Sequence, residues 1–323
     1  MEALPSQLEP FADRLAEIFG PQEGRRILGS MSEPKRLGVF RNPLRTTPQP
    51  DGDALAGLQP LAGLPDMCWA PPQARQALVT GEPVISGQLY LMNPSSYLAA
   101  LLLGPEPEQE VLDLAAAPGG KTLVMAALMG NRGRLAAVES VRPRFHRMRA
   151  NLARCGVTLV QSYLDDGRRT GRKVPERFDR VLLDAPCSSE ARIRLDEPAS
   201  YRHWSPKKIR ETSRKQRGLI RSAFAALKPG GRLLYCTCAF APEENELVVQ
   251  HLLGAETRAR VLPLEEAMAT RRPDRLDAPR GWAPGLVCWQ GRALDGAIRG
   301  AVRLLPDDLW DGFFLCLIGK EPR

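Results

Sequence analysis

Two cysteine-containing segments carry the residue types in this chain that are best suited to covalent chemistry. The apolar run RVLLD ends at Asp184 and continues through Pro186 to Cys187, and the run RLLYC is followed by Thr237 and Cys238. A thiolate is a strong nucleophile, and a carboxyl group beside it can hold or give a proton. A lone free cysteine is usually a small buried hydrophobe, but two that follow neighbouring strands predict one catalytic pocket.

The remaining cysteines are interpreted as ordinary packing residues. The chain has seven cysteines in all, an odd number, and no C-x-x-C pair. The sequence therefore predicts neither a disulfide framework nor a zinc site, and no metal is expected. Strand alternation predicts that Cys236 points to the opposite face from its strand neighbours. The packing group comprises Cys68, Cys155, Cys236, Cys288 and Cys316.

The stretch VLDLAAAPGGKT has the pattern of a strand, a glycine turn and a helix start, which is typical of nucleotide-binding folds. A phosphate-binding P-loop would require a glycine where Ala115 stands, so that match is imperfect. A Rossmann-like cofactor site instead requires an acidic residue about 20 residues on, to bind ribose hydroxyls, and Glu139 follows the next predicted strand. The cofactor loop is therefore expected to comprise Ala115, Ala116, Ala117, Pro118, Gly119, Gly120 and Lys121.

These candidate residues require elements that bring several strand ends together. From about residue 93, apolar strands alternate with amphipathic helices, which is the signature of a mostly parallel, doubly wound α/β domain. Ligands bind such sheets at the carboxyl ends of the strands, where both cysteine segments and the glycine turn lie. Strands are predicted over 111–114, 134–138, 158–160, 178–183, 231–236 and 312–320, and helices over 93–103, 121–129, 143–155, 206–227 and 243–253.

The first 88 residues predict a small α+β module ahead of a catalytic domain at 89–323. Phe11, Leu15 and Ile18 lie on one face of a helix that Gly20 and Pro21 end. The mixture of short helices and strands after it predicts a compact unit. These elements are a helix at 24–28, a strand at 37–40, a turn at 47–53, a short helix at 54–58 and extended segments at 68–69 and 78–79.

The charge of the chain indicates an anionic partner. It has 45 Lys and Arg against 37 Asp and Glu, a net charge of +8 and a pI near 9.3. Residues 191–221 hold ten basic and three acidic residues, with Tyr201, His203 and Trp204 between them. Phosphates require the charges and an extruded base can stack on the rings, so this segment is expected to face a nucleic acid. Without a signal-peptide pattern or an 18-residue apolar run, a soluble, cytoplasmic protein is expected. It is also expected to be a monomer.

Together the motifs resemble the RNA cytosine-5 methyltransferases of the Sun/Nop group, which use S-adenosylmethionine and have a Rossmann-like catalytic domain. The resemblance covers nearly the whole chain. DLAAAPGGKT is similar to the family's cofactor loop, AVES to its ribose-binding acid, DDGR to its third cofactor segment, and LLDAPCS and CTCAFAPEENE to its two cysteine motifs. Residues 1–88 are similar, more weakly, to its small RNA-contacting module. The segment SEARIRLDEP departs from the family's glycine-containing pattern.

The resemblance implies a role for each candidate residue. Cys238 would attack C6 of a cytosine in rRNA or tRNA, on the way to 5-methylcytidine. Asp184 would bind the N3 and N4 edge of the base and border the cofactor, and Cys187 would act in product release. Glu139 would bind the ribose of S-adenosylmethionine. Asp166 would lie near the adenine, with the preceding aspartate as a rival.

Three other functions compete with this interpretation. A P-loop triphosphatase would bind ATP with magnesium, but Ala115 and the two cysteines disfavour it. A catalytically inactive RNA-binding assembly factor would tolerate the loss of Cys238. A DNA cytosine-5 methyltransferase would take its nucleophile from the Pro-Cys motif, which here means Cys187.

Overall fold

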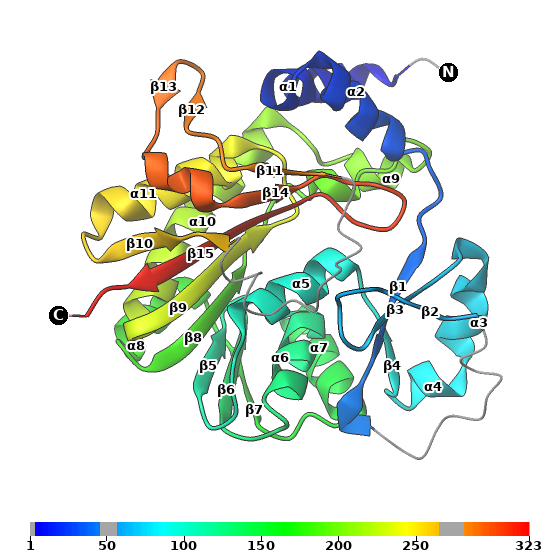
Figure 1. Cartoon of the computed structure of the whole chain (residues 1–323), viewed down its shortest axis with the longest axis vertical. Helices are drawn as coiled ribbons and strands as arrows, with labels where there is room; N and C mark the ends of the chain where they lie inside the picture. The colour runs from blue at the N-terminus through cyan, green and yellow to red at the C-terminus, as the bar shows by residue number, and fades with distance from the viewer. Residues whose placement is uncertain (1–3, 46–56, 265–280, 323) are drawn as a thin grey trace.

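The computed structural model describes residues 4–45, 57–264 and 281–322 (Figure 1). Within these residues the largest sheet is built from nine strands: β5 (Glu110–Asp113), β6 (Arg134–Glu139), β7 (Val160–Leu164), β8 (Phe178–Asp184), β9 (Leu227–Thr237), β10 (Ala259–Leu262), β11 (Trp282–Pro284), β14 (Val302–Leu304) and β15 (Phe313–Lys320). Their order is β11-β14-β15-β9-β8-β5-β6-β7, and β10 also pairs with β15.

The five strands from β5 to β9 run parallel and position the site. β5 pairs with β6 on one side and with β8 on the other, so the chain winds outward from β5 in both directions. β15 then runs antiparallel to β9. The chain reverses its winding direction between the neighbouring strands β5 and β8, so this is the topological switch point, where ligands bind beyond the carboxyl ends of the strands. The predicted Rossmann-like, doubly wound fold is confirmed.

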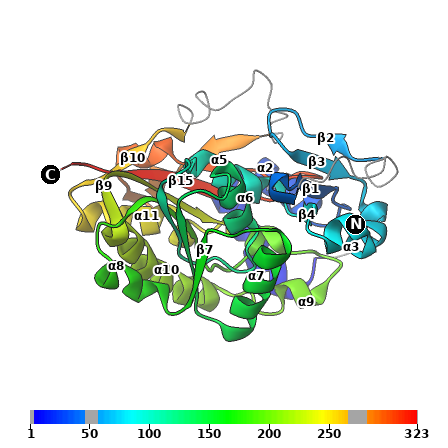
Figure 2. The same cartoon turned by 90° about the horizontal axis from the view of Figure 1, so that it is seen from below.

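Helices cover both faces of the sheet, because successive strand residues point to opposite sides. On β8, Leu182 joins the core formed with α5 (Pro94–Leu103), α6 (Gly120–Leu128) and α7 (Arg142–Arg154). Val181 and Leu183 join the other core, formed with α10 (Pro206–Ala226) and α11 (Glu246–Ala255), which lie together in Figure 2. The part of a strand that is buried on both faces is an apolar run, and the run at residues 181–183 made β8 recognisable in the sequence.

The N-terminal region divides between two locations. β1 (Leu37–Arg41), β2 (Gln59–Pro60), β3 (Met67–Ala70) and β4 (Leu89–Leu91) form a separate antiparallel sheet in the order β2-β3-β1-β4. α1 (Glu9–Phe19) and α2 (Pro21–Ser30) lie apart from it, near α9 (Pro198–Tyr201) (Figure 1). The Phe11 ring packs edge-on against Trp204, with 5.3 Å between centroids. The helices are thus anchored on the large domain, unlike those of the expected compact module, and β4 lies just beyond the expected boundary at residue 88.

Several local predictions differ from the structure. Residues 78–79 were expected to be extended but lie in the helix α3 (Arg75–Thr80). β7 begins where the strand predicted at 158–160 ends. It is an edge strand, so its exposed polar residues obscured it in a search for apolar runs. The strands β10, β11 and β14, of three or four residues each, were not predicted. The predicted turn at 47–53 and most of the helix at 54–58 lie outside the described residues.

The remaining elements are short. They are α4 (Glu82–Ile85), α8 (Thr170–Lys173) and the hairpin of β12 (Cys288–Trp289) and β13 (Arg292–Ala293). None of the helices in the described ranges combines the length and apolar character that a membrane span needs.

Candidate active site

A cavity of about 790 Å³ lies at the carboxyl ends of β5, β6, β8 and β9. This volume falls in the range of pockets that enclose a small ligand or cofactor. Gly119 alone among the predicted site residues does not line it. Its φ of 105°, just before α6, is one that only glycine adopts freely, so it turns the chain. The wall includes Ala115, Ala116, Ala117, Pro118, Gly120, Lys121, Glu139, Asp166, Asp184, Cys187 and Cys238.

A side chain of α7 fixes the turn between β5 and α6. Arg144 Nη2 donates a hydrogen bond to the Ala117 carbonyl at 2.8 Å. A Cβ on Gly120 would lie 3.1 Å from the Tyr90 ring, so glycine lets the loop approach that ring closely. The first N–H groups of α6 have no acceptor within the helix, and they make its N-terminus a binding site for electronegative atoms.

Glu139 is the last residue of β6 and only 4% of it is exposed. Its Oε1 accepts a hydrogen bond from the Val141 N–H at 2.8 Å, which fixes the orientation of the carboxylate. Its Oε2 lies 3.7 Å from Arg144 Nη1, a looser contact. The carboxylate borders the cavity, and Oε2 is less constrained than Oε1. Oε2 can therefore accept a hydrogen bond from a ligand hydroxyl.

The two aspartates after β7 face different cavities. Asp166 borders the main cavity, and its Oδ1 accepts from the Arg168 N–H at 3.0 Å. Asp165 instead pairs with Arg169 at 2.8 Å and lines a separate cavity of about 290 Å³. The geometry therefore favours Asp166 over Asp165 for contact with a ligand in the main cavity.

Asp113 is a site residue that the sequence interpretation missed. It ends β5, borders the cavity and is 1% exposed. Its Oδ2 accepts from Thr122 Oγ1 at 2.7 Å, whereas Oδ1 has no hydrogen-bond partner among the described residues. Burial raises its pKa to about 7. A buried oxygen without a donor is costly, so a ligand N–H group would satisfy it. Its position directly before the glycine turn could have identified Asp113 as a site residue from the sequence.

Asp184 ends β8 and is fixed by the lysine of the glycine turn. Lys121 Nζ donates to Asp184 Oδ2 at 2.7 Å and to Ser96 Oγ at 3.1 Å. The other carboxylate oxygen lies 3.8 Å from Cys236 Sγ. Cys236 is buried, as expected of a packing residue, but it contacts the site, and burial raises the pKa of its thiol. The glycine turn and the end of β8 are thus joined by one ion pair.

Cys187 and Cys238 follow the paired strands β8 and β9, and their sulfur atoms are 3.4 Å apart. The hydrogen bond between them lowers the pKa of Cys238 to about 7, and the charge of Arg192 lowers it too. The same hydrogen bond, with burial, raises the pKa of Cys187. Near neutral pH, Cys238 is therefore the member of the pair that carries the thiolate, which is the nucleophilic form.

A buried carboxylate joins the two cysteine loops. Glu190 accepts hydrogen bonds from the backbone N–H groups of residues 240–241, at 2.7 and 2.8 Å. It also accepts from Trp204 Nε1 at 2.9 Å. Beside it, the Ala191 N–H donates to the Cys238 carbonyl at 3.0 Å. These hydrogen bonds therefore tie the segment after Cys187 to the segment that carries Cys238.

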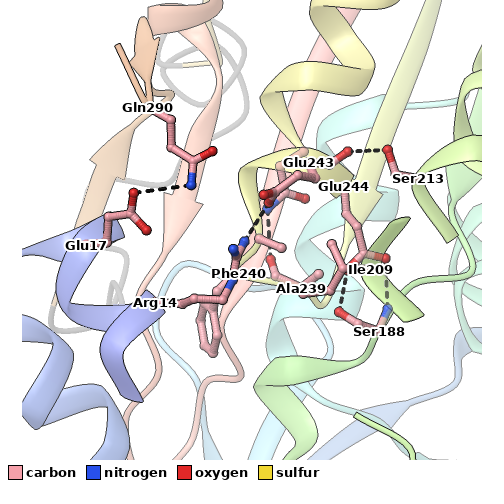
Figure 3. A network of polar contacts seen from close by, with 12 residues as sticks. Arg14, Glu17, Ser188, Ile209, Ser213, Ala239, Phe240, Glu243, Glu244 and Gln290 are labelled. Carbon is pink, nitrogen blue, oxygen red and sulfur yellow. Dashed lines mark hydrogen bonds and ion pairs between the residues drawn. The ribbon is translucent and has the colours of Figure 1, made fainter. Parts of the chain in front are cut away.

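The acidic motif after Cys238 ties these loops to the helices around them (Figure 3). Glu244 Oε1 accepts from the Ser188 N–H at 2.9 Å and from Thr212 Oγ1 at 2.5 Å, and Oε2 bonds the Ser188 hydroxyl. Glu243 forms an ion pair of 2.6 Å with Arg14 of α1. One acid thus fixes the residue after Cys187, and its neighbour anchors the N-terminal helix.

The next two residues of the motif are fully buried. Asn245 Oδ1 accepts from Thr237 Oγ1 at 2.6 Å, and its Nδ2 donates to the Ala239 carbonyl at 2.9 Å, so it clamps the residues on both sides of the nucleophile candidate. Glu246 forms a bidentate ion pair with Arg303, at 2.7 and 2.5 Å. The sequence interpretation used this motif only as a signature and did not foresee these positioning contacts.

The basic segment forms an exposed stripe on α10, whose members are three or four residues apart and share one face. The expectation that its aromatic residues stack on a base was wrong for Tyr201 and Trp204. Both are only 6% exposed, because they pack beneath the segment. His203 is exposed. The stripe consists of Lys207, Arg210, Arg214, Arg217 and Arg221.

Comparison with known proteins supports one family. Residues 100–318 match the family described as 16S rRNA methyltransferase RsmB/F. Ribosomal RNA small subunit methyltransferase F of Cronobacter sakazakii is 43% identical over 213 residues, which cover 64% of this chain but only 44% of that protein. The chain thus spans less than half the length of this curated relative.

Two solved structures agree. A methyltransferase homolog protein from Pyrococcus horikoshii has a TM-score of 0.78 and 30% identity, over 99% of this chain and 100% of its own. NSun6 from Pyrococcus horikoshii, solved with SFG, has a TM-score of 0.76 and 19% identity, over 100% of both chains, and supports the fold alone. The chain belongs to the 16S rRNA methyltransferase RsmB/F family, whose members are S-adenosylmethionine-dependent enzymes with a Rossmann-like fold.

Proposed function

We propose that the chain methylates C5 of a cytosine in ribosomal RNA, through a covalent bond between Cys238 and C6 of the base. One observation carries the proposal. Cys238 Sγ lies 3.4 Å from Cys187 Sγ, in a cavity that also includes Asp184 and the glycine turn. A nucleophile, a second thiol, a carboxylate and a cofactor-sized space in one cavity are what this chemistry requires.

The cavity fits S-adenosylmethionine through groups that the chain already presents. The unpartnered oxygen of Asp113 suits the cofactor's ammonium group, and Glu139 suits the ribose hydroxyls. Asp166 lies on the wall beyond β7, where the adenine would lie. The glycine turn, Ala115 to Lys121, lets the backbone approach the ligand closely. When bound, S-adenosylmethionine supplies an electrophilic methyl group.

The protein's side chains activate the base. Cytosine C5 is a weak nucleophile, and addition of a thiolate at C6 gives it enamine character. Cys238 makes this addition, and Asp184, oriented by Lys121, hydrogen-bonds the N3 and N4 edge. After methyl transfer the C5 proton leaves and the bond from sulfur to C6 breaks. Cys187 acts in that release.

The RNA-binding surface is proposed to combine the α10 stripe with the N-terminal region. Lysine and arginine side chains in the stripe suit phosphates. The residues Tyr90 and Leu91 of β4 line the main cavity, and β4 pairs with β1, so the N-terminal sheet reaches this cavity through β4. The match to rRNA methyltransferases favours rRNA over tRNA as the substrate.

The test is methyl transfer from isotopically labelled S-adenosylmethionine to 16S rRNA, to small ribosomal subunits, to tRNA and to DNA. Labelled 5-methylcytidine in rRNA is expected from nucleoside digestion and mass spectrometry. Cys238→Ser should abolish it, while Cys288→Ser, at an exposed cysteine in β12, should not. Label in another nucleoside, or in DNA alone, would refute the proposal. An unchanged rate in Cys238→Ser would refute the covalent mechanism.

A further inference from the structure

We propose that the Arg192 guanidinium stabilises the Cys238 thiolate by its positive charge, and so keeps the nucleophile in its reactive form. The inference rests on the proposed function, in which Cys238 attacks the base. It concerns a residue in SEARIRLDEP, the segment that departs from the pattern of the resembling family.

The backbone fixes Arg192 relative to Cys238. Arg192 ends the single 3₁₀ turn Glu190–Arg192, and its N–H donates to the Ser189 carbonyl at 2.9 Å. The preceding N–H, of Ala191, donates to the Cys238 carbonyl at 3.0 Å. Glu190 bonds the backbone just after Cys238 as well. The turn therefore cannot move away from the thiol without breaking several buried hydrogen bonds.

The charge of Arg192 is available to the cavity. Its side chain is exposed and lines the same cavity as Cys238. Within the described residues, its guanidinium has no hydrogen bond or ion pair, whereas Arg168 pairs with Asp166 at 2.6 Å and Arg144 bonds a carbonyl of the glycine turn. An arginine that is held by backbone contacts but left unpaired points to a partner that carries negative charge only in the reactive state.

The hydrogen bond from Cys187 favours the Cys238 thiolate most, but two other influences oppose the thiolate. Burial by itself disfavours a thiolate, and the carboxylate of Asp184 opposes it further. Lys121 is already paired with Asp184, so its charge is largely neutralised. Arg192 opposes both effects and lowers the pKa of Cys238 more than Asp184 raises it. The other titratable groups nearby are Cys187 and Cys236, with Glu244 facing Cys187 and Asp311 facing Arg192.

The test measures the thiol directly, without RNA or cofactor. The full-length protein is alkylated with iodoacetamide from pH 5.5 to 9, and mass spectrometry of peptides gives the rate at Cys238, with the exposed Cys288 as internal reference. The midpoint of the pH dependence of this rate reports the pKa of Cys238. Arg192→Met should raise this midpoint by about one pH unit or more, so that alkylation of Cys238 at pH 6 becomes about tenfold slower. Arg192→Lys keeps the charge and should keep the midpoint near that of the wild type.

Controls separate charge from shape and from folding. Lys215→Met removes another positive charge from the cavity wall, but Lys215 is not among the main charges that act on Cys238, so the midpoint should move much less than in Arg192→Met. Arg192→Gln replaces Arg192→Met if the latter has a lowered melting temperature. An unmoved midpoint in a folded, uncharged variant would overturn the proposal, as would an equal movement in Arg192→Lys. A protein that lacks methyltransferase activity but shows the expected midpoints would refute only the proposed function.

Discussion

Replacing Glu244 with glutamine is expected to flatten the pH dependence of the protein's stability between pH 5 and 8. Glu244 is fully buried behind Cys187, and burial raises its pKa from 4.5 to about 7. When protonated, Oε2 can donate to the Ser188 hydroxyl while Oε1 accepts from the Ser188 N–H and Thr212. A glutamine amide reproduces both functions, donating from Nε2 and accepting at Oε1, so the variant should keep the fold.

The sign and size follow from linkage. A raised pKa means that the folded protein binds this proton more tightly than the unfolded chain. The stability that it contributes is therefore fully present below pH 4.5 and is lost as the pH rises through about 7. Each pKa unit corresponds to about 1.4 kcal/mol, so the wild type should lose up to about 3 kcal/mol of unfolding free energy across this window. The Glu244→Gln variant should not show this loss of unfolding free energy, because glutamine does not ionise.

Urea denaturation followed by tryptophan fluorescence, at pH 5, 6, 7 and 8, measures the difference. The stability of Glu244→Gln relative to wild type should increase with pH, because the other buried acids with raised pKa values, Glu190 and Asp113, are present in both proteins. Glu211→Gln, at an exposed position on α10, should show no such trend. A constant difference at all four pH values would mean that Glu244 is ionised throughout, and the reasoning would be refuted.

Three further predictions concern the cofactor, RNA and the core. S-adenosylmethionine should raise the melting temperature of the protein, and ATP with magnesium should not; stabilisation by ATP alone would contradict this prediction. Glu139→Ala should weaken cofactor binding by about 1–3 kcal/mol, as measured by calorimetry. The double variant Lys207→Glu, Arg214→Glu should bind an rRNA fragment more weakly. The slope of log affinity against log salt concentration should become shallower by about 0.7 per lost phosphate contact, and an unchanged slope would exclude these residues from the interface. Arg303→Met should lower the unfolding free energy by about 3–5 kcal/mol in urea denaturation, because the Glu246 carboxylate would be buried without a cation to pair with. A variant as stable as the wild type would disprove this.

The strand ends were predictable from sequence because strands buried on both faces must be apolar, and the polar residues that end them stand out. This reasoning found the segments that bring Asp184, Cys187 and Cys238 into one cavity. Asp166, which borders this cavity, was preferred over its neighbour because DDGR resembles the family's third cofactor segment. Short or edge strands such as β7 carry no such apolar signal.

The partners of each side chain were not predictable, because they join positions far apart in the sequence. Lys121 pairs with Asp184 across 63 residues, and Glu244 bonds Ser188 across 56. Tyr201 and Trp204 were misassigned to the RNA surface, since one sequence cannot distinguish an exposed ring from a buried one. The amphipathic helix α1 gave no sign that it would pack against Trp204 in particular.

The central claim is that Cys238 is the nucleophile and Cys187 acts in release, and denaturing electrophoresis of protein mixed with rRNA and S-adenosylmethionine tests it most directly. Cys187→Ala should still form the bond to C6 but fail to break it, and so accumulate an RNA–protein species that survives denaturation. Cys238→Ala should form no such species and no 5-methylcytidine. A trapped species in Cys238→Ala, with none in Cys187→Ala, would contradict the account, because the nucleophile would then be the cysteine that follows Pro186.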